Sequence, residues 1–178
     1  MHSYRVEGIV IKRKNFGEAD RILTVYTKHK GKISVLAKGV RKITSKRSSH
    51  IELLTHSVMG IHDGKFAILT ETESLYHYSE LKSDLKKAGY GFYICELIDG
   101  LCAEHQENRG VFDLLQNTLF KLESTEDPKS LIAFFEKELL TLLGFWPENR
   151  AYLENSDAYI EEIMEKKIKT KKSLPYFS

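Results

Sequence analysis

The stretch that decides the fold is Arg21-Ile22-Leu23-Thr24-Val25-Tyr26-Thr27-Lys28-His29-Lys30-Gly31-Lys32-Ile33-Ser34-Val35-Leu36-Ala37-Lys38. Its first seven residues are rich in β-branched side chains and predict a strand. The next four, residues 28–31, form a tight hairpin connection in which Gly31 is suited to a positive φ. The remaining residues alternate, with Ile33, Val35 and Ala37 on one face and Lys32, Ser34, Leu36 and Lys38 on the other. A β-hairpin is therefore expected over residues 21–38.

Further strands are expected on both sides of this hairpin. Upstream, residues 4–11 are rich in β-branched side chains, and Gly8 near their middle suggests a bulge or a sharp bend. Downstream, residues 51–62 and 65–71 predict two strands joined at Asp63-Gly64, a strong hairpin signal. Five short strands within about 70 residues fit a small closed barrel such as the five-stranded OB-fold.

The period of the apolar residues changes after Glu73 to that of a helix. One face of a long helix is predicted by Leu81, Leu85, Ala88, Phe92, Cys95, Ile98 and Cys102. Gly89 and Gly91 weaken this helix and suggest close packing of another element against it.

Three further helices are expected. A second apolar stripe covers residues 111–122, and Asp127-Pro128 looks like the N-cap and first residue of a third helix that ends at Gly144. Ser156 is a candidate cap for a last helix, with lysines in its final turn. The chain is thus expected to be α+β, with an OB-fold nucleic-acid-binding domain over residues 1–78 and an all-α helical domain over residues 79–178.

Composition narrows the class of protein. The 178 residues are 42% hydrophobic and 29% charged, which is typical of a folded globular chain. The densest apolar run, residues 139–146, is too short to cross a bilayer, and residues 1–5 lack the apolar segment of an export signal. The two cysteines, Cys95 and Cys102, cannot form a disulfide framework. We expect a cytoplasmic protein with reduced thiols and no membrane partner.

Charge is unevenly distributed along the chain. Residues 1–79 carry a net charge of +7 and residues 80–178 a net charge of −5. No carboxylate occurs between Arg21 and Glu52. Segregation of this kind suggests a polyanionic partner for the first half, although a solvated basic surface is the alternative.

Motifs of common enzyme classes are missing. The sequence has no phosphate-binding P-loop, no His-Glu-x-x-His and no Cys-x-x-Cys. Cys95, Cys102 and His105 could share a helix face, but buried thiols are favoured over a metal site. We therefore expect a binding protein with no catalytic residues, no metal and no cofactor.

The candidate binding residues are basic and aromatic side chains of the first half. Candidate DNA-binding residues are Arg13, Lys14, Arg21, Lys28, Lys30, Lys32, Lys38, Arg41, Lys42, Lys46 and Arg47. Phe16, Tyr26 and Phe66 could stack on bases, although each also fits a core or rim position. The sharpest signal is Lys38-Gly39-Val40-Arg41-Lys42 with Lys46-Arg47, because its small polar neighbours leave the charges accessible.

Short motifs connect the chain to a known family. In the first half they are Glu7-Gly8-Ile9-Val10-Ile11, Gly17-Glu18-Ala19-Asp20-Arg21-Ile22, Thr27, Gly31-Lys32-Ile33, Ala37-Lys38-Gly39-Val40-Arg41 and Leu69-Thr70-Glu71. In the second half they are Tyr93–Leu97 with Glu96, Leu142-Leu143-Gly144-Phe145 and Pro147. Taken together and in this order, they resemble the bacterial recombination mediator family RecO. The resemblance covers nearly the whole chain and implies an OB-fold followed by a helical domain.

The resemblance also implies a function and partners. Proteins of this family bind single- and double-stranded DNA and anneal complementary strands. With the partner RecR they help the recombinase RecA to displace the single-stranded-DNA-binding protein, whose acidic tail the helical domain contacts. The resemblance thus implies a non-enzymatic, nucleoid-associated protein of DNA repair and homologous recombination.

Two features depart from the family pattern. Many members carry a cysteine cluster, often a zinc site, after the Gly-Phe-x-Pro segment, whereas residues 148–155 contain no cysteine. No zinc is therefore expected. The chain is also shorter than usual, yet Lys167-Ile168-Lys169-Thr170-Lys171-Lys172-Ser173-Leu174 resembles the family's closing basic segment. An internal loss in the helical domain is expected rather than a simple truncation.

Two other functions remain open on the sequence alone. An OB-fold barrel with this charge could bind RNA instead of DNA. Alternatively, the acidic helical half could be the working surface of a protein-interaction adapter, with the basic loop merely solvated.

Overall fold

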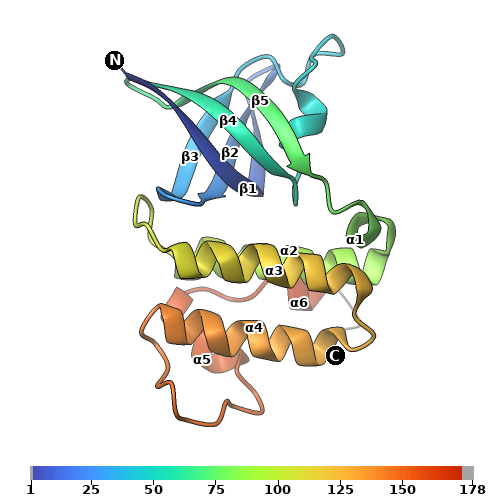
Figure 1. Cartoon of the computed structure of the whole chain (residues 1–178), viewed down its shortest axis with the longest axis vertical. Helices are drawn as coiled ribbons and strands as arrows, with labels where there is room; N and C mark the ends of the chain where they lie inside the picture. The colour runs from blue at the N-terminus through green and yellow to red at the C-terminus, as the bar shows by residue number, and fades with distance from the viewer. Residues whose placement is uncertain (1, 174–178) are drawn as a thin grey trace.

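A computed structural model describes residues 2–173 of the chain, so Leu174 in the closing basic segment lies outside the described residues. The first half is a closed barrel of five strands, β1 His2–Phe16, β2 Asp20–Thr27, β3 Gly31–Ala37, β4 His56–Asp63 and β5 Ile68–Tyr76. The strands are ordered β1-β2-β3-β5-β4, and only the β3–β5 pair that closes the barrel is parallel (Figure 1). The five-stranded OB-fold prediction is confirmed.

Six helices follow the barrel within the described residues. They are α1 Ser79–Ser83, α2 Leu85–Leu101, α3 Arg109–Ser124, α4 Pro128–Leu142, α5 Asp157–Met164 and α6 Thr170–Ser173. The layer formed by α2 and α3 lies directly against one end of the barrel, and α4 and α5 lie beyond it (Figure 1). None of the helices within residues 2–173 has the length and apolar character needed to cross a membrane.

Local sequence explains where the helices begin. The Asp127 carboxylate accepts a hydrogen bond from the Ser130 backbone, and Pro128 occupies the first turn of α4, as the sequence predicts. Asn108 caps α3 in the same way. Gly144, with a φ of +81°, follows the end of α4.

The single long helix expected over residues 81–102 is wrong. Asp84 adopts an extended conformation, ends α1 and caps α2 through the backbone N–H groups of Lys86 and Lys87. Leu85 is consequently 80% exposed instead of joining a stripe. Because barrel and helices surround α2, it buries residues on several faces, and the simple amphipathic pattern fails.

Two other local predictions need correction. The β-bulge in β1 lies between Val10 and Lys12 rather than at Gly8. Gly8 serves a close approach instead, because an added Cβ would lie 2.6 Å from the Val25 side chain. Ser156 does not cap α5; its hydroxyl donates to the buried Glu136 carboxylate at 2.6 Å. Because α5 ends at Met164, the lysines expected in its last turn lie beyond the helix.

Two hydrophobic clusters form the core. One fills the barrel with residues such as Val10, Leu23 and Val35. The other joins the helices and includes Ile9, Ile11, Tyr26 and Leu54 of the barrel. Leu54 also presses on α2 so closely that a Cβ at Gly91 would lie 2.9 Å from it, which agrees with the expected close packing. The barrel and the helices therefore share one core across their junction.

Candidate nucleic-acid interface

The basic loop, residues 38–47, lies at the end of the barrel remote from the helices (Figure 1). Its conformation is held by hydrogen bonds to neighbouring strands. The Arg47 guanidinium donates to the carbonyls of Lys38 at 2.7 Å and Leu69 at 3.0 Å. The Gly39 backbone N–H donates to the Asp20 carboxylate at 2.7 Å. Arg47 and Asp20 thus fix the loop against the barrel.

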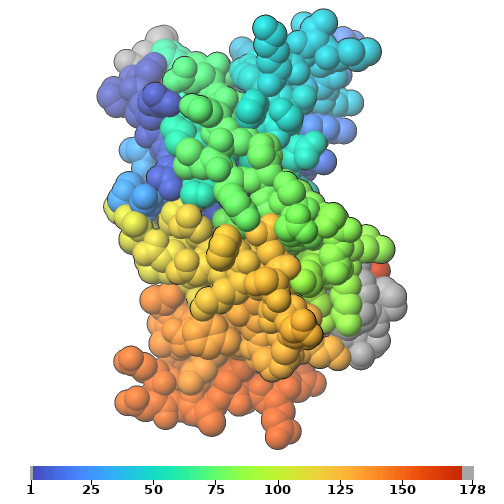
Figure 2. Space-filling view, turned by 45° about the vertical axis from the view of Figure 1, so that its right-hand side comes forward, coloured from blue at the N-terminus to red at the C-terminus, as the bar shows by residue number. Residues whose placement is uncertain are grey.

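Arg41 fastens the same loop to the β1–β2 connection. Its backbone N–H donates to the Ala19 carbonyl, and its guanidinium donates to the Gly17 carbonyl at 3.1 Å. Lys38, Lys42 and Lys46 remain exposed, and their ammonium groups form no ion pair with any residue between 2 and 173. Hydrogen bonds therefore fix the conformation of the loop, while its lysines stay exposed. The loop projects from the molecule in the space-filling view (Figure 2).

Three arginines, Arg13, Arg21 and Arg41, form what we call the arginine row. In the register of β1 with β2, Arg13 pairs with Leu23 and Asn15 pairs with Arg21, so the first two arginines are diagonal neighbours on one side of the sheet. The Arg21 guanidinium donates to the Asn15 side chain at 3.2 Å. Burial lowers the pKa of Arg21, and the charges of Arg13 and Arg41 lower it further. Like charges held together in this way favour a bound anion.

An apolar hollow of about 290 Å³ lies on the outer face of β2 and β3. Ile22, Leu36, Phe16 and Phe66 are among the residues that line it, and the two aromatic side chains are 52% and 65% exposed. Lys14 pairs with Ile22 in the register, so it projects from the same face. In OB-folds, the face of strands 2 and 3 between the β1–β2 and β4–β5 loops is where oligonucleotides bind. The structure therefore brings two of the three candidate stacking residues together.

Three of the candidate basic residues lie at the opposite end of the barrel. Lys32 is 8% exposed, and its ammonium donates to the Asp99 carbonyl at 2.6 Å. Lys28 pairs with Glu7 at 3.1 Å. Lys30 is exposed but lies over the Tyr4 ring. The structure does not join them to the basic loop, and Lys32 has no free surface for a phosphate.

Tyr26 is the candidate stacking residue that the structure shows to be buried. It is 1% exposed and belongs to the core shared with the helices, and its hydroxyl reaches the Asn108 carbonyl at 3.5 Å. Its position near the end of β2 places it under α2 and α3, so its ring cannot stack on a base. The sequence of β2 does not show that helices cover that end of the strand.

Sequence reasoning missed Lys65 beside the hollow. Its ammonium lies 5.9 Å from the centre of the Phe66 ring, at the β4–β5 connection. The Asp63-Gly64 turn signal could have revealed it, because the residue after such a turn lies on a loop beside the expected binding face.

The cysteines lie in the core. Cys95 and Cys102 are both buried, and burial raises the pKa of their thiols to about 12 and about 11. Among residues 2–173, no group of three His, Cys, Asp or Glu side chains is arranged to hold a metal ion.

The closed barrel, its braced cationic loop and its aromatic hollow define an OB-fold protein joined to a helical body. Comparison with family models matches "Recombination protein O N terminal" to residues 1–78 and "Recombination protein O C terminal" to residues 82–151. The chain belongs to the RecO family. Residues 152–178 lie beyond the matched ranges.

Several relatives named "DNA repair protein RecO" are similar to this chain. The protein of Roseiflexus sp. (strain RS-1) is 36% identical over 146 residues, which is 82% of this chain and 51% of the relative. A Dehalococcoides mccartyi protein is 35% identical over 150 residues, or 84% of this chain and 59% of the relative. The Listeria welshimeri protein is 31% identical over 144 residues, or 80% and 56%. The chain thus spans between half and three fifths of the length of these relatives.

Proposed function

We propose that this chain is a non-enzymatic DNA-binding protein of DNA repair and homologous recombination. The observation that carries the proposal is the braced basic loop, whose free lysines stand beside the outer-face hollow and the arginine row. Lysines and arginines bind phosphates without regard to sequence, and exposed aromatic rings stack on unpaired bases. The DNA repair names of the relatives support the same role.

Strand annealing follows from the same surface. Two complementary strands repel each other through their phosphates, and a cationic surface that holds one strand lowers this repulsion for the second. The side chains gathered here are cations and aromatic rings, which bind and orient strands but supply no nucleophile or general base. We therefore propose that the protein binds and anneals DNA rather than cutting or joining it.

Family membership suggests the partners. We propose that the chain acts with a RecR-type protein and with the single-stranded-DNA-binding protein, and thereby assists loading of the RecA recombinase. The net charge of −5 over residues 80–178 disfavours DNA over most of the helical body and supports protein contacts there.

The test is fluorescence anisotropy of a labelled oligothymidine at several salt concentrations. Reversing Lys38, Lys42 and Lys46 to Glu should weaken binding by roughly a hundredfold or more and reduce the salt slope by about two to three units, because each lost phosphate contact releases about one counterion fewer. The matched control is Lys121→Glu, an exposed lysine on α3. Equal affinity and slope in the triple variant and wild type would overturn the assignment of the loop.

Two further experiments distinguish the contribution of base stacking from that of charge, and binding of DNA from binding of RNA. Phe16→Ala and Phe66→Ala should each weaken binding to single strands by roughly tenfold while the salt slope stays unchanged, because stacking releases no counterions. Competition with an RNA of the same sequence distinguishes the substrates: preference for RNA would replace DNA as the ligand. Failure of wild type to bind any oligonucleotide at low salt would favour a protein adapter.

A further inference from the structure

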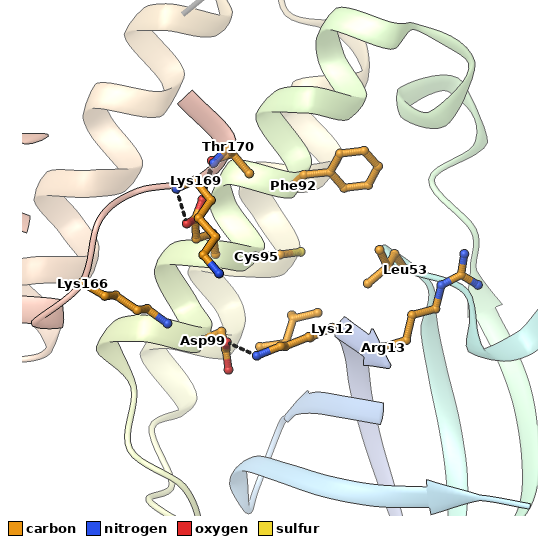
Figure 3. A pocket seen from close by; sticks show the side chains of 11 residues that line it. Lys12, Arg13, Leu53, Phe92, Cys95, Asp99, Lys166, Lys169 and Thr170 are labelled. Atoms are coloured by element: carbon orange, nitrogen blue, oxygen red, sulfur yellow. Dashed lines mark hydrogen bonds and ion pairs between the residues drawn. The ribbon is translucent and has the colours of Figure 1, made fainter. Parts of the chain in front are cut away.

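A second pocket lies at the junction, between β1 of the barrel, α2 and the segment that follows α5. It holds about 300 Å³, and Figure 3 shows its side chains converging from these three elements. It differs from the outer-face hollow in its lining and in its position. We call it the junction pocket.

The floor of the junction pocket is apolar and includes an exposed aromatic ring. Ile11 and Leu53 come from the barrel and Cys95 from α2. Phe92 also belongs to α2 and points toward the barrel side of the pocket, where it keeps 39% of its surface exposed although both its neighbours, Gly91 and Tyr93, are buried (Figure 3). A ring left open in this way offers a stacking surface.

Both acidic groups of the pocket have partners: Asp99 is paired with cations, whereas Glu96 keeps its charge and is held by hydrogen bonds. Asp99 pairs with Lys12 at 3.1 Å and with Lys32 at 3.5 Å. Burial alone would raise the pKa of Asp99, but the hydrogen bond from Lys12 and the charges of Lys12, Lys32 and Lys166 hold it below its usual value. The Glu96 carboxylate accepts hydrogen bonds from the backbone N–H groups of Lys169 and Thr170 at 2.6 and 2.9 Å.

The cations at the rim form no direct ion pair within the described residues. The side chains of Arg13, Lys166 and Lys169 line the pocket, and within the described part of the chain they form no hydrogen bond or ion pair. Glu96 fixes the backbone at Lys169 and so holds this lysine beside the pocket. The result is an apolar floor with unpaired positive charges around it, which suits a flat ring that carries a phosphate.

The junction pocket is continuous with the arginine row. Arg13 belongs to both, and Arg21 and Arg41 continue from it toward the basic loop. A strand whose phosphates follow the row would therefore arrive at the pocket. This continuity favours a nucleotide of a DNA strand over the acidic segment of a protein.

We infer that the junction pocket binds one unpaired nucleotide of single-stranded DNA, with its base on Phe92 and its flanking phosphates on Arg13, Lys166 and Lys169. This inference rests on the proposed function and extends it to strand preference. A base in a duplex cannot enter without unstacking, which costs a few kcal/mol. Lys166 and Lys169 lie beyond the residues that the family models match.

The test compares single-stranded and duplex oligonucleotides of the same length. Phe92→Ala should lower single-strand affinity roughly tenfold and leave duplex affinity unchanged, and Phe92→Tyr should retain single-strand affinity because its ring also stacks. Lys166→Glu with Lys169→Glu should reduce the single-strand salt slope by about 1.4 units, or about 0.7 for each lost phosphate contact. The matched control is Lys121→Glu with Lys129→Glu, which changes the same charge at exposed positions of α3 and α4 that do not line the pocket. Fluorescence of an internal 2-aminopurine should report stacking that Phe92→Ala removes.

The outcomes separate this inference from the proposed function. If wild type binds DNA and the pocket variants bind single strands as the control does, the inference fails and the proposed function stands. If single-strand and duplex affinities fall equally, the pocket does not select an unpaired nucleotide. If the variants lose only a labelled acidic peptide, the pocket belongs to a protein partner. If wild type binds no DNA, both proposals fail together.

Discussion

Lysines at the two ends of the barrel have opposite surroundings. At the junction end, Lys32 is buried against Asp99 and Lys28 is half-buried against Glu7. At the remote end, Lys38 and Lys46 are exposed and unpaired with any described residue. A buried ammonium requires partners because it loses its hydration, whereas an exposed one keeps its water and remains free for a ligand. Residue type alone therefore does not tell whether a lysine stabilises the fold or is available to bind a ligand.

The largest effect is expected from breaking the core at the junction end. Phe112 of α3 is fully buried, and its ring packs edge-on against His56 of β4. Phe112→Ala should lower the free energy of unfolding by about 3–5 kcal/mol. Because the core is shared, barrel and helices should still unfold in one transition. Urea unfolding followed by circular dichroism and by Trp146 fluorescence measures both. A loss below about 1 kcal/mol, or separate transitions, would contradict a shared core.

A smaller effect on stability should distinguish a lysine at the junction end of the barrel from a lysine in the basic loop. Lys32→Ala should lower the free energy of unfolding by about 1–3 kcal/mol, because the partly buried Asp99 carbonyl loses its donor. Lys46→Ala should change stability by less than about 0.5 kcal/mol but should weaken DNA binding. Thermal unfolding and anisotropy on both variants test the contrast. Equal stability losses would show that the two ends do not differ in this way.

The smallest effect is a pH dependence confined to the junction end. Burial lowers the pKa of His56, although its partner Glu7 opposes this. Unfolded histidine binds a proton below a pKa of about 6.5, and folded His56 binds it less readily, so stability should fall as pH drops from about 7 toward about 5. Burial would raise the pKa of Glu7, but hydrogen bonds from Lys28 and His56 lower it, so its contribution is lost only at more acidic pH.

Substitution of His56 tests this dependence. His56→Gln should flatten the decline in the free energy of unfolding between about pH 7 and about pH 5, measured by urea unfolding at several pH values. An unchanged slope in His56→Gln would assign the decline to other groups.

Sequence predicted the barrel well because its signals are local. The alternation of Ile33, Val35 and Ala37 and the Gly31 turn each depend only on neighbouring residues, and the structure has all three side chains buried and a φ of +65° at Gly31. The basic loop was equally visible, because its charge density is a property of consecutive residues. The structure adds that Arg41 and Arg47 brace the loop.

The failures arise where distant segments meet. From the sequence alone, Tyr26 and Lys32 are interpreted as lying on an exposed face of the sheet. In the structure the helices cover this face, and no local sequence pattern indicates that contact. The helix over residues 81–102 breaks at Asp84 because a cap and the surrounding core override the apolar spacing. Lys169 reaches the junction pocket through Glu96, which lies 73 residues earlier in the sequence.

The hydrophobic cluster in which Ile9, Tyr26 and Leu54 pack against the helices has a mechanical consequence. Because the same side chains pack against both halves, we expect the barrel and the helical body to move as one unit. A partner that rotates the helical body would then rotate the barrel by the same angle. The orientation of a strand held at the remote end could then be set by a partner that never touches nucleic acid.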